Sequence, residues 1–515
     1  MVVSRRSFLY GTTALTLSAG LYACSQTSED EPDSSSAPET PQGWDSQPRQ
    51  LPIPPLAKSE RAGDRFVFKL KAQEAQTEIL PGTKTTTWGF NGAMLGPTIR
   101  VSRGEKVDLE FTNSLTEVTA VHCHGMLLPA KMDGGPHSPI DPGQTWTASF
   151  TVEQPAATLW YHPHPHGVTG LQAYRGLAGM IIIDDDVEDS LDLPREYGVD
   201  DIPVVLMDAN FTPDGQLDET LDDNLGLQGK VPHVNGITNP KFTATTSRLR
   251  LRLLNGSNMR FHNVGFDNGQ SFYHIASDSG LLDKPREVTN VMLGPGERAE
   301  IVVDLAAGKD VVLTSLGFND NLGVPEDAQA LDFGLKDVFS LLTIQAPAQA
   351  SPAVSMPKVL DPSAAAPVDT SNSPERDFEL NTFSINDKSM DMSRVDVVID
   401  HSEPEIWNVT NGNSDWIHNF HIHNCAFKVL ESSATEVVFD TLGWKDTVTI
   451  PPGVSLKLGV IFGQYRDNHY PYMYHCHMLY HEDQGMMGQF MMVNKGEKAE
   501  LDTAYTQAGG HKHHH

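Results

Sequence analysis

Short runs in which apolar and polar residues alternate recur from about residue 62 to near residue 497. Examples are RFVFKL, TIRV and RAEIVV, at residues 65–70, 98–101 and 298–303. Because successive side chains of a strand point to opposite faces, such alternation is typical of strands with one buried face. Gly, Pro, Asn and Asp separate the runs, and long helical periodicity is scarce. The pattern predicts an all-β fold built from antiparallel sandwiches.

Two markers occur three times in the same order and indicate an internal repeat. The first is a strand that ends in Asn, at Asn113, Asn255 and Asn411. The second is a Pro-Gly turn that precedes a new strand, at residues 142–143, 295–296 and 452–453. Successive copies lie roughly 150 residues apart, which suits one sandwich domain per copy. We therefore expect three domains, at residues 60–186, 187–347 and 377–497.

The remaining segments have compositions that do not suit a core. Residues 348–376 are rich in Ala, Pro and Ser and are predicted to link the second and third domains. Residues 498–515 form a tail that ends in several histidines, and they are left out of the fold prediction. Residues 25–59 are rich in Ser, Pro, Glu, Asp and Gln, which predicts a disordered tether.

The first residues have the features of an export signal. Residues 4–9 read SRRSFL, a twin-arginine signature, and the uncharged apolar run that follows ends at Ala23. That run is too short to span a bilayer comfortably, so residues 1–24 are predicted to be a signal peptide. LYAC, ending at Cys24, resembles a lipobox, at which the cysteine would be acylated; ordinary cleavage near Ala23 is the alternative. We expect export to the periplasm or cell envelope, with or without a lipid anchor.

Composition narrows the classes of partner. Lys and Arg total 37 and Asp and Glu total 67, which gives a formal net charge of −30. A surface this acidic repels phosphate backbones, so nucleic acid is not an expected partner. Four cysteines in 515 residues do not make a disulfide scaffold. The 21 histidines are the unusual feature, and their spacing suggests the chemistry.

Four histidine clusters each contain a His-x-His pair, two in the first predicted domain and two in the third. The pairs are His122 and His124, His162 and His164, His421 and His423, and His475 and His477. On a strand, residues i and i+2 point to the same face, so each pair can direct two imidazoles at one point. One zinc ion takes only four ligands, and these pairs offer twice as many. The pattern predicts a multinuclear metal cluster between the first and third domains.

The last cluster adds a second kind of ligand set. Cys476, His481 and Met486 offer a thiolate, an imidazole and a thioether within one short segment. A second imidazole, for which His418 is free, would complete the His₂Cys set with a weak axial Met that marks a blue-copper site. Surface or packed histidines are the alternative for any single pair, but four pairs together with this set favour metal.

These motifs resemble the multicopper oxidase family, in its three-domain bacterial laccase and copper-efflux oxidase branch. They are HCHG, WYHPH, HNFHIH and HCHMLYHEDQGMM, at residues 122–125, 160–164, 418–423 and 475–487. The resemblance extends over about residues 60–495. It implies three consecutive cupredoxin-like Greek-key β-sandwich domains and four copper ions per chain, and we expect a monomer.

The resemblance also implies a role for each ligand. Those of one type 1 copper would be His418, Cys476, His481 and Met486. Those of one type 2 copper would be His122 and His421. Those of a type 3 pair would be His124, His162, His164, His423, His475 and His477. Cys476 would pass electrons between the two centres, because it stands between two type 3 ligands.

Two acidic residues lie where the family has acids near the oxygen-reducing centre. They are Asp133, which follows the first histidine pair, and Glu482, which directly follows His481. The resemblance implies that both deliver protons, because reduction of dioxygen to water consumes protons. Asp133 precedes two glycines, so a purely turn-forming role is the alternative for it.

Four residues depart from the family pattern. Asn419 stands where the family usually has Pro, and Asn424 where it usually has Gly. Neither removes a ligand, but either could alter the exposure or potential of the type 1 site. Cys123 and Cys425 are also unusual; they could form a disulfide, or they could be two buried thiols.

The implied activity is that of a laccase-like oxidoreductase, which oxidises phenols or aromatic amines in one-electron steps and reduces dioxygen to water. A cuprous oxidase that serves periplasmic copper tolerance is the alternative. Oxidases of that kind carry a Met-rich insert, whereas residues 348–400 hold only Met356, Met390 and Met392. Asp415 could bind an incoming cation, although it lies in a turn-like sequence. A copper-free scaffold and a two-domain copper nitrite reductase are disfavoured by the complete ligand set.

Overall fold

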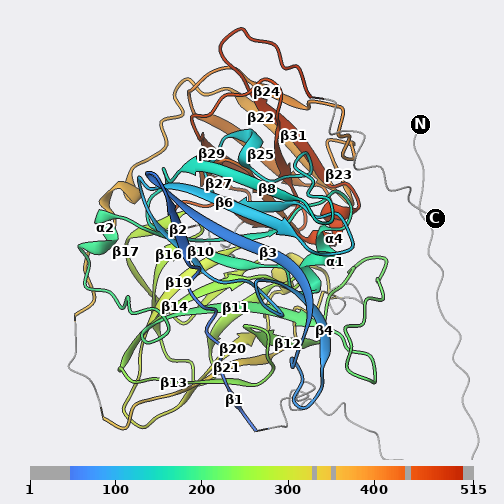
Figure 1. Cartoon of the computed structure of the whole chain (residues 1–515). Helices are drawn as coiled ribbons and strands as arrows, with labels where there is room; N and C mark the ends of the chain where they lie inside the picture. Colours follow the sequence, from blue (N-terminus) through green and yellow to red (C-terminus); the bar gives the residue numbers. More distant parts are fainter. Residues whose placement is uncertain (1–46, 327–332, 350–354, 435–441, 503–515) are drawn as a thin grey trace, which may run out of the picture. The chain divides into compact units, whose positions relative to one another are not determined.

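The computed structural model describes residues 47–326, 333–349, 355–434 and 442–502 (Figure 1). Strands form nearly all of its regular structure, which confirms the all-β prediction. The α-helices are short: α1 (Thr169–Tyr174), α2 (Asp186–Asp189) and α4 (Leu479–Asp483). Single 3-10 turns are η1 (Ala130–Met132), η2 (Asn321–Gly323) and η3 (Pro362–Ala365). In the described ranges no helix is both long enough and apolar enough to cross a membrane.

The first pair of sheets is coloured blue to teal in Figure 1 and encloses its own apolar core. One sheet has β2 (Ser59–Ala62), β3 (Arg65–Thr77), β6 (Lys106–Asn113) and β8 (Thr145–Thr151), with β4 (Thr85–Phe90) on β3. The other has the order β5 (Ile99–Ser102), β10 (Gly179–Asp184), β9 (Ala157–Pro163) and β7 (Val121–His124). Strand β6 alternates between buried and half-exposed positions along most of its length, as the sequence predicts.

The middle pair of sheets is larger and, apart from the blue β1, is coloured green to yellow. One sheet has the order β1 (Arg49–Gln50), β13 (Pro240–Thr243), β21 (Phe339–Gln345), β20 (Val311–Leu316), β15 (His262–Phe266) and β18 (Asn290–Leu293). The other has the order β12 (Val231–Val234), β11 (Asp201–Ala209), β14 (Arg248–Asn255), β19 (Arg298–Asp304), β16 (Phe272–Ser277) and β17 (Gly280–Val288). β19 is buried on both faces rather than one, because other parts of the chain cover this sheet.

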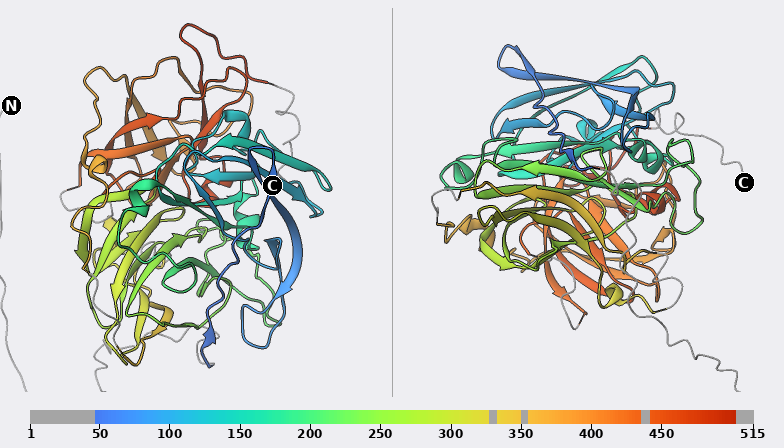
Figure 2. Two further views of the ribbon diagram at one scale, coloured as in Figure 1. Left: turned by 60° about the vertical axis from the view of Figure 1, so that its left-hand side comes forward. Right: turned by 90° about the horizontal axis from the view of Figure 1, so that it is seen from below.

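The third pair of sheets is coloured orange to red (Figures 1 and 2). One sheet has the order β23 (Ser384–Ile385), β22 (Glu375–Asn381), β25 (Glu405–Asn411), β29 (Ser455–Phe462) and β27 (Cys425–Ser432). The other has the order β24 (Val397–Ile399), β31 (Met487–Met492), β30 (Tyr472–His475), β26 (His418–Ile422) and β28 (Thr447–Ile450). Three sheet pairs match the expected triplication, while the exact domain boundaries stay predictions.

The repeated asparagines make the same contacts in all three copies. Each lies fully buried at a strand end, and its Oδ1 accepts from the backbone N–H two residues later. Each Nδ2 donates to the carbonyl just before the Pro-Gly turn, on Ile140, Leu293 and Ile450. These buried bonds explain why both markers recur together, because one closes onto the other.

Two predicted segments need correction. The tether does not extend to residue 59, because β1 pairs with β13 and Leu51 is buried against the middle core. Arg49 holds this end in place by donating to the Glu78 carbonyl at 2.7 Å. The linker at residues 348–376 is also packed where it is described: Leu360 is buried and bonds the backbone of β17, and β22 already begins at Glu375. The composition of both segments did not suggest a core contact because only a few of their residues, such as Leu51 and Leu360, are buried.

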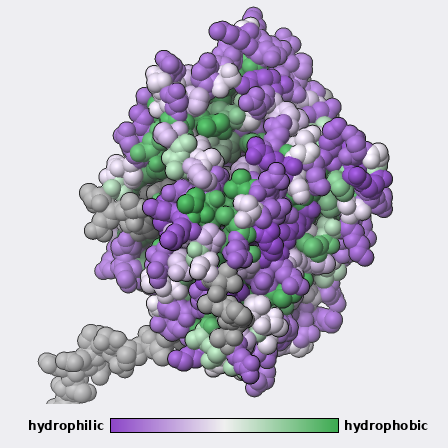
Figure 3. All heavy atoms as spheres, turned by 90° about the vertical axis from the view of Figure 1, so that its left-hand side faces the viewer, coloured by the Kyte–Doolittle hydropathy of each residue, from purple (hydrophilic) through white to green (hydrophobic). Residues whose placement is uncertain are grey.

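The surface agrees with the acidic composition. On the face drawn in Figure 3 most side chains are hydrophilic, and apolar residues lie in small separate patches. Patches of that size are ordinary for the surface of a single chain. The predicted signal peptide, Cys24 and the terminal histidines lie outside the described residues.

Candidate metal centre

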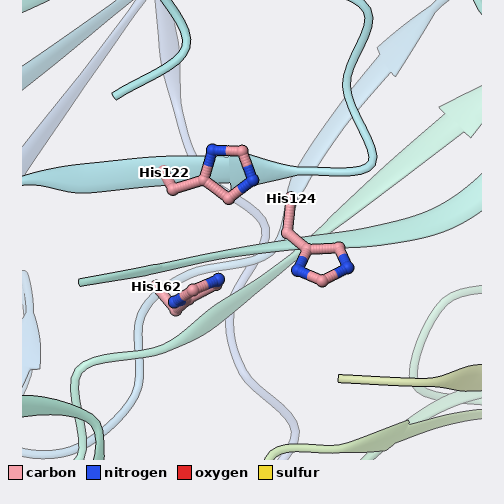
Figure 4. Close-up of side chains that lie close together, drawn as sticks. All are labelled: His122, His124 and His162. Carbon is pink, nitrogen blue, oxygen red and sulfur yellow. The ribbon is translucent and has the colours of Figure 1, made fainter. Parts of the chain in front are cut away.

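The structure brings the four histidine pairs together from both ends of the chain. In the first sheet pair, His122 of β7 lies directly opposite His162 of β9. In the third, His421 of β26 lies directly opposite His475 of β30. Figure 4 shows three of these rings, those of His122, His124 and His162. Strand β7 contains both members of its pair, whereas the second histidine of each other pair lies just beyond the end of β9, β26 or β30.

The eight imidazoles form one buried cluster. In three groups, one side-chain nitrogen of each member lies within 4.8 Å of the others: His122/His124/His162, His122/His421/His423 and His164/His423/His475. The ring of His477 completes the set, with its centroid 4.9 Å from that of His124. All eight side chains are at most 1 % exposed.

Hydrogen bonds on the outer side leave the inner nitrogens of three rings without a partner. The Nδ1 atoms of His122, His162 and His421 each donate to a backbone carbonyl at 2.8 Å. The Nε2 atoms of the same rings are buried and have no hydrogen-bond partner. Buried polar atoms without partners are costly, so these nitrogens fit a bound cation. The donor set therefore suits a metal cluster.

The ionisation of the histidines agrees with this interpretation. Burial is the main cause that lowers their pKa values, and neighbouring imidazoles lower most of them further; this holds for His122, His124, His162, His164, His421, His423 and His477. Neutral imidazole is the form that binds metal. The cluster is therefore ready for cations without prior loss of protons.

A second ligand set lies one residue away from the cluster along the chain. The Sγ atom of Cys476 is 3.7 Å from Nδ1 of His418 and 3.6 Å from Nδ1 of His481, and the two nitrogens are 3.2 Å apart. All three side chains are fully buried. Met486 is also buried, and its carbonyl accepts from the Cys476 backbone N–H. Burial raises the pKa of Cys476 to about 12, so a thiolate here requires a cation beside it.

The two predicted acids both contact cluster histidines. Asp133 follows η1, and its Oδ2 lies 2.6 Å from Nδ1 of His423. Its Oδ1 has no hydrogen-bond partner, and burial raises its pKa well above the usual range. Glu482, on α4, lies 3.3 Å from Nδ1 of His164 and 3.2 Å from Nδ1 of His475. Burial opposes its ionisation, but these two imidazoles outweigh burial and lower the pKa of Glu482.

The departures from the family pattern are accommodated locally. Asn419 accepts from the Cys476 thiol and the His477 backbone N–H, and it donates to the Pro295 carbonyl at 2.8 Å. Asn424 has a φ of 51°, a conformation that Gly adopts freely and Asn tolerates better than most residues. Cys123 and Cys425 are buried free thiols, so the disulfide alternative is excluded.

Sequence reasoning missed one acid of this centre. Asp446 is fully buried directly before β28, and its Oδ1 lies 3.0 Å from Nε2 of His124. Its backbone carbonyl accepts from His421, as that of Asp133 accepts from His122. The repeat could have indicated it, because both acids follow the first histidine of a pair. The correspondence was hidden because Asp133 lies 11 residues after His122, whereas Asp446 lies 25 residues after His421.

The ligand set around Cys476 is covered by aromatic side chains that were also missed. The ring of Trp416 stacks on that of His481, with a centroid distance of 5.4 Å and an interplanar angle of 16°. Phe383 meets the same imidazole edge-on at 5.4 Å. His418 is tied down on its far side, where Nε2 contacts the Asn413 side-chain oxygen at 2.9 Å. Neither imidazole is exposed, so an electron donor would approach through this cover.

Comparisons with known proteins agree with the motifs. Sequence profiles described as multicopper oxidase match residues 71–188 and 357–496. The multicopper oxidase mco of Staphylococcus haemolyticus is 36 % identical over 449 residues, covering 86 % of this chain and 93 % of the relative. The cell division protein FtsP of Escherichia coli is 33 % identical over 457 residues, covering 87 % and 93 %.

Solved structures show the same likeness. A multi-copper oxidase from Pediococcus acidilactici is 35 % identical, with a TM-score of 0.79, and the match covers 88 % of this chain and 93 % of that one. A laccase-like multi-copper oxidase from an Ochrobactrum species, with activity towards lignin model compounds, is 33 % identical, with a TM-score of 0.77, covering 86 % and 100 %. The chain therefore belongs to the multicopper oxidase family, the copper-dependent oxidoreductases of cupredoxin-like fold that use dioxygen as electron acceptor.

Proposed function

We propose that this protein is a laccase-like oxidase that takes electrons singly from phenols or aromatic amines and reduces dioxygen to two waters. One observation carries the proposal: the Cys476 set and the histidine cluster are joined through the chain, because His475 and His477 flank Cys476. When bound, copper supplies one-electron transfer at the first set and the reduction of dioxygen at the second. The proposed complement is four ions.

The ligand assignments are part of the proposal. The mononuclear type 1 site would use His418, Cys476, His481 and Met486. The type 2 site would use His122 and His421. The type 3 pair would use His124, His162, His164, His423, His475 and His477. Support comes from the convergence of these side chains, their burial and the nitrogens that lack protein partners.

Protons for water formation would come from two carboxyl groups with different roles. Asp133, with its raised pKa and free Oδ1, suits a group that carries a proton and releases it. Glu482 contacts ring nitrogens of His164 and His475 and stays ionised, so it suits a group that accepts a proton and passes it on. Their separate positions would deliver protons to the cluster from two sides.

The surroundings of His481 favour organic donors over cuprous ion. Trp416 and Phe383 offer flat apolar surfaces on which an aromatic donor can stack. A cavity of about 170 Å³ lies beside α4, lined by Tyr480, the apolar Leu171 and Leu221, and Glu219. The methionines near this segment are core residues instead: Met478, Met487, Met491 and Met492 are each at most 2 % exposed. These four thioethers are therefore turned away from solvent, while Met390, whose backbone N–H donates to the Gly485 carbonyl, is half-buried.

Oxygen uptake separates the two donors. The copper-loaded, desalted protein is given a simple phenol, with and without added copper ions. Uptake with phenol alone is expected. Uptake that appears only with added copper would make cuprous ion the donor and would move the role to copper tolerance.

FtsP is named a cell division protein, so the second class to weigh for this chain is the copper-free scaffold. Twelve filled ligand positions speak for an oxidase, because a scaffold has no need of eight buried histidines gathered in one cluster. Copper content decides between the two classes.

We infer export through the twin-arginine route, with Cys24 as a site of lipid attachment, from residues outside the described part of the chain. Replacement of Arg5 and Arg6 by Lys should trap the protein inside the cell. Cys24→Ala should release it from the membrane fraction. Unchanged fractionation in either variant would refute the corresponding half of the proposal.

A further inference from the structure

The middle pair of sheets contributes no His-x-His pair, yet its turn at residues 293–298 packs against the copper ligands. Gly296 has a φ of +83°, and a Cβ atom on it would lie 2.9 Å from the His477 ring. The neighbouring Pro295 carbonyl accepts from Asn419 at 2.8 Å. The backbone here approaches so closely that only glycine fits. The middle sheets thus form one wall of the site.

Arg298, at the end of this turn, is fully buried and uses every N–H of its guanidinium. Nε donates to the Thr158 carbonyl at 3.1 Å, in strand β9 of the first sheet pair. Nη1 donates to the Gly296 carbonyl and Nη2 to the Asp278 carbonyl, both in the middle pair. The remaining N–H of each terminal nitrogen donates to a different carboxylate oxygen of Asp446, in the third pair. One side chain therefore joins all three sheet pairs.

Asp446 carries this connection to a copper ligand. Its Oδ1 lies 3.0 Å from Nε2 of His124, and it also accepts from the Thr447 hydroxyl at 2.9 Å. The Thr447 oxygen is itself 3.2 Å from Nε2 of His124. Because that hydroxyl already donates its proton to the carboxylate, both neighbours of Nε2 are acceptors there. Nε2 of His124 must therefore carry the hydrogen.

His124 therefore carries its hydrogen on the opposite ring nitrogen from three other imidazoles of the cluster. His122, His162 and His421 donate from Nδ1 and leave Nε2 without a partner. In His124 it is the buried Nδ1 that has no partner. Nδ1 is closer to the backbone, so the ring reaches less far and its orientation is more restricted. A ring of this kind needs a fixed acceptor on its outer side, and Asp446 supplies it.

We propose that Arg298 is a positioning residue of the histidine cluster, acting through Asp446. It holds that carboxylate so that His124 keeps its hydrogen on Nε2 and offers Nδ1 to copper. This inference rests on the proposed copper function. The two parallel bonds from a planar guanidinium fix the carboxylate in angle as well as distance, which a lysine ammonium does not do. The middle sheets thereby set the geometry of a ligand that they do not contain.

The other buried acids near Arg298 and Asp446 have a cationic partner of their own. Lys445 lies 3.0 Å from Asp278 and 3.4 Å from Glu297, while Arg298 also lies 3.7 Å from Asp278. All are at most 2 % exposed. Asp278 and Glu297 thus have a cation of their own in Lys445. Substitution of Arg298 would leave Asp446 as the acid that loses its partner.

The test compares Arg298→Lys, Arg298→Met and Asp446→Asn with the unaltered protein after copper loading. A copper chelator is titrated in while two signals are followed: the near-ultraviolet band of the type 3 pair and the blue band of the type 1 site. The type 3 band of the variants should disappear at a chelator concentration roughly 10–100-fold lower than in the unaltered protein. This is the range expected when a hydrogen-bond partner of a metal ligand is lost. The blue band should be lost at the same chelator concentration as in the unaltered protein.

A matched control is Arg250→Lys, which removes another buried guanidinium of the middle sheets; Arg250 bonds Glu300 and Glu188 and makes no hydrogen bond to Arg298, Asp446 or His124. It should leave the type 3 band unchanged. The inference is overturned if Arg298→Lys and Asp446→Asn keep normal chelator resistance, or if Arg250→Lys loses it equally. If Arg298→Met does not fold, the two milder variants still decide. Absence of both bands from the unaltered protein would refute the proposed function instead.

Discussion

Asp133 and Asp446 occupy corresponding positions in the first and third sheet pairs, yet their surroundings differ. Each uses its backbone carbonyl to accept from the first histidine of a pair, at 2.8 Å in both cases. Each directs its carboxylate at a ring that stacks on that histidine. Asp133 contacts His423, whose ring centroid lies 3.8 Å from that of His122. Asp446 contacts His124, whose ring centroid lies 3.7 Å from that of His421.

The difference is a single cation. Arg298 forms two bonds with Asp446, whereas Asp133 has no basic Lys or Arg partner among the described residues and keeps one oxygen without a hydrogen bond. Burial raises the pKa of Asp446, but Arg298 opposes this increase and its two bonds fix the carboxylate in place. A buried carboxylate without such a partner is easily protonated. The same backbone arrangement therefore serves proton supply on one side and ligand positioning on the other.

Asp133→Asn should give the largest effect, because it removes the proton while keeping an oxygen for His423. Turnover of dioxygen should fall by roughly 10²–10⁴-fold, the range for loss of a positioned proton donor. Copper content and both absorption bands should stay as they are. Oxygen uptake with a phenol, measured beside the absorption spectrum, checks this. Normal turnover in the variant would show that the two acids do not divide the work in this way.

Glu188→Gln tests whether the loss of a different buried ion pair of the middle sheets also disturbs copper binding. Burial raises the pKa of Glu188, but Arg250 and Arg252 outweigh burial and bring it to about 2. The variant should lose about 3 kcal/mol of unfolding free energy at neutral pH, since it leaves buried cations underpaired. Urea unfolding measures this loss, and the absorption bands should be unchanged.

The pH dependence of that loss has a definite sign. Because the pKa of folded Glu188 lies below the ordinary value of 4.5, its contribution is fully present above pH 4.5 and fades as the pH falls towards about 2. The stability gap between Glu188→Gln and the unaltered protein should therefore narrow over this range. A gap that stays constant or widens would show that the charge of Glu188 is not what stabilises this region.

Asp446→Asn should have a smaller effect on turnover than Asp133→Asn and a larger effect on copper retention. We expect the trinuclear copper to be held roughly 10–100-fold less tightly. With copper kept in excess, turnover should recover most of its normal rate. Failure to recover, with full copper occupancy, would mean that Asp446 also handles protons and that the contrast with Asp133 is wrong.

Trp416→Ala should give the smallest effect and is confined to the donor side. Loss of one stacking surface should raise KM for a phenol by roughly 2–10-fold, since an aromatic pair contributes about 0.5–1.5 kcal/mol. The rate with a small inorganic donor, such as ferrocyanide, should not fall, because that donor does not stack. Equal losses with both donors would instead indicate a disturbed type 1 site.

Much of this arrangement could be predicted from the sequence because it is local. The strand that was predicted to end at Asn113 is β6, and the spacing of the histidine pairs indicated which imidazoles converge. The double burial of β19 could not be predicted, since the cover comes from distant segments. The contact between Arg298 and Asp446 was missed for the same reason: the two residues lie 148 residues apart, and neither belongs to a histidine motif. The strand at residues 49–50 was missed because its stability comes from its partner β13.

Copper content tests the central claim most directly. The protein is loaded with copper, desalted, and analysed for metal per chain together with its visible and electron paramagnetic resonance spectra. The proposed ligand sets predict about four coppers per chain, one of them a blue type 1 centre and one a type 2 centre. Fewer than three coppers after full loading, or no blue band, would contradict the assignment of an oxidase. A value near zero would favour a copper-free role in the cell envelope.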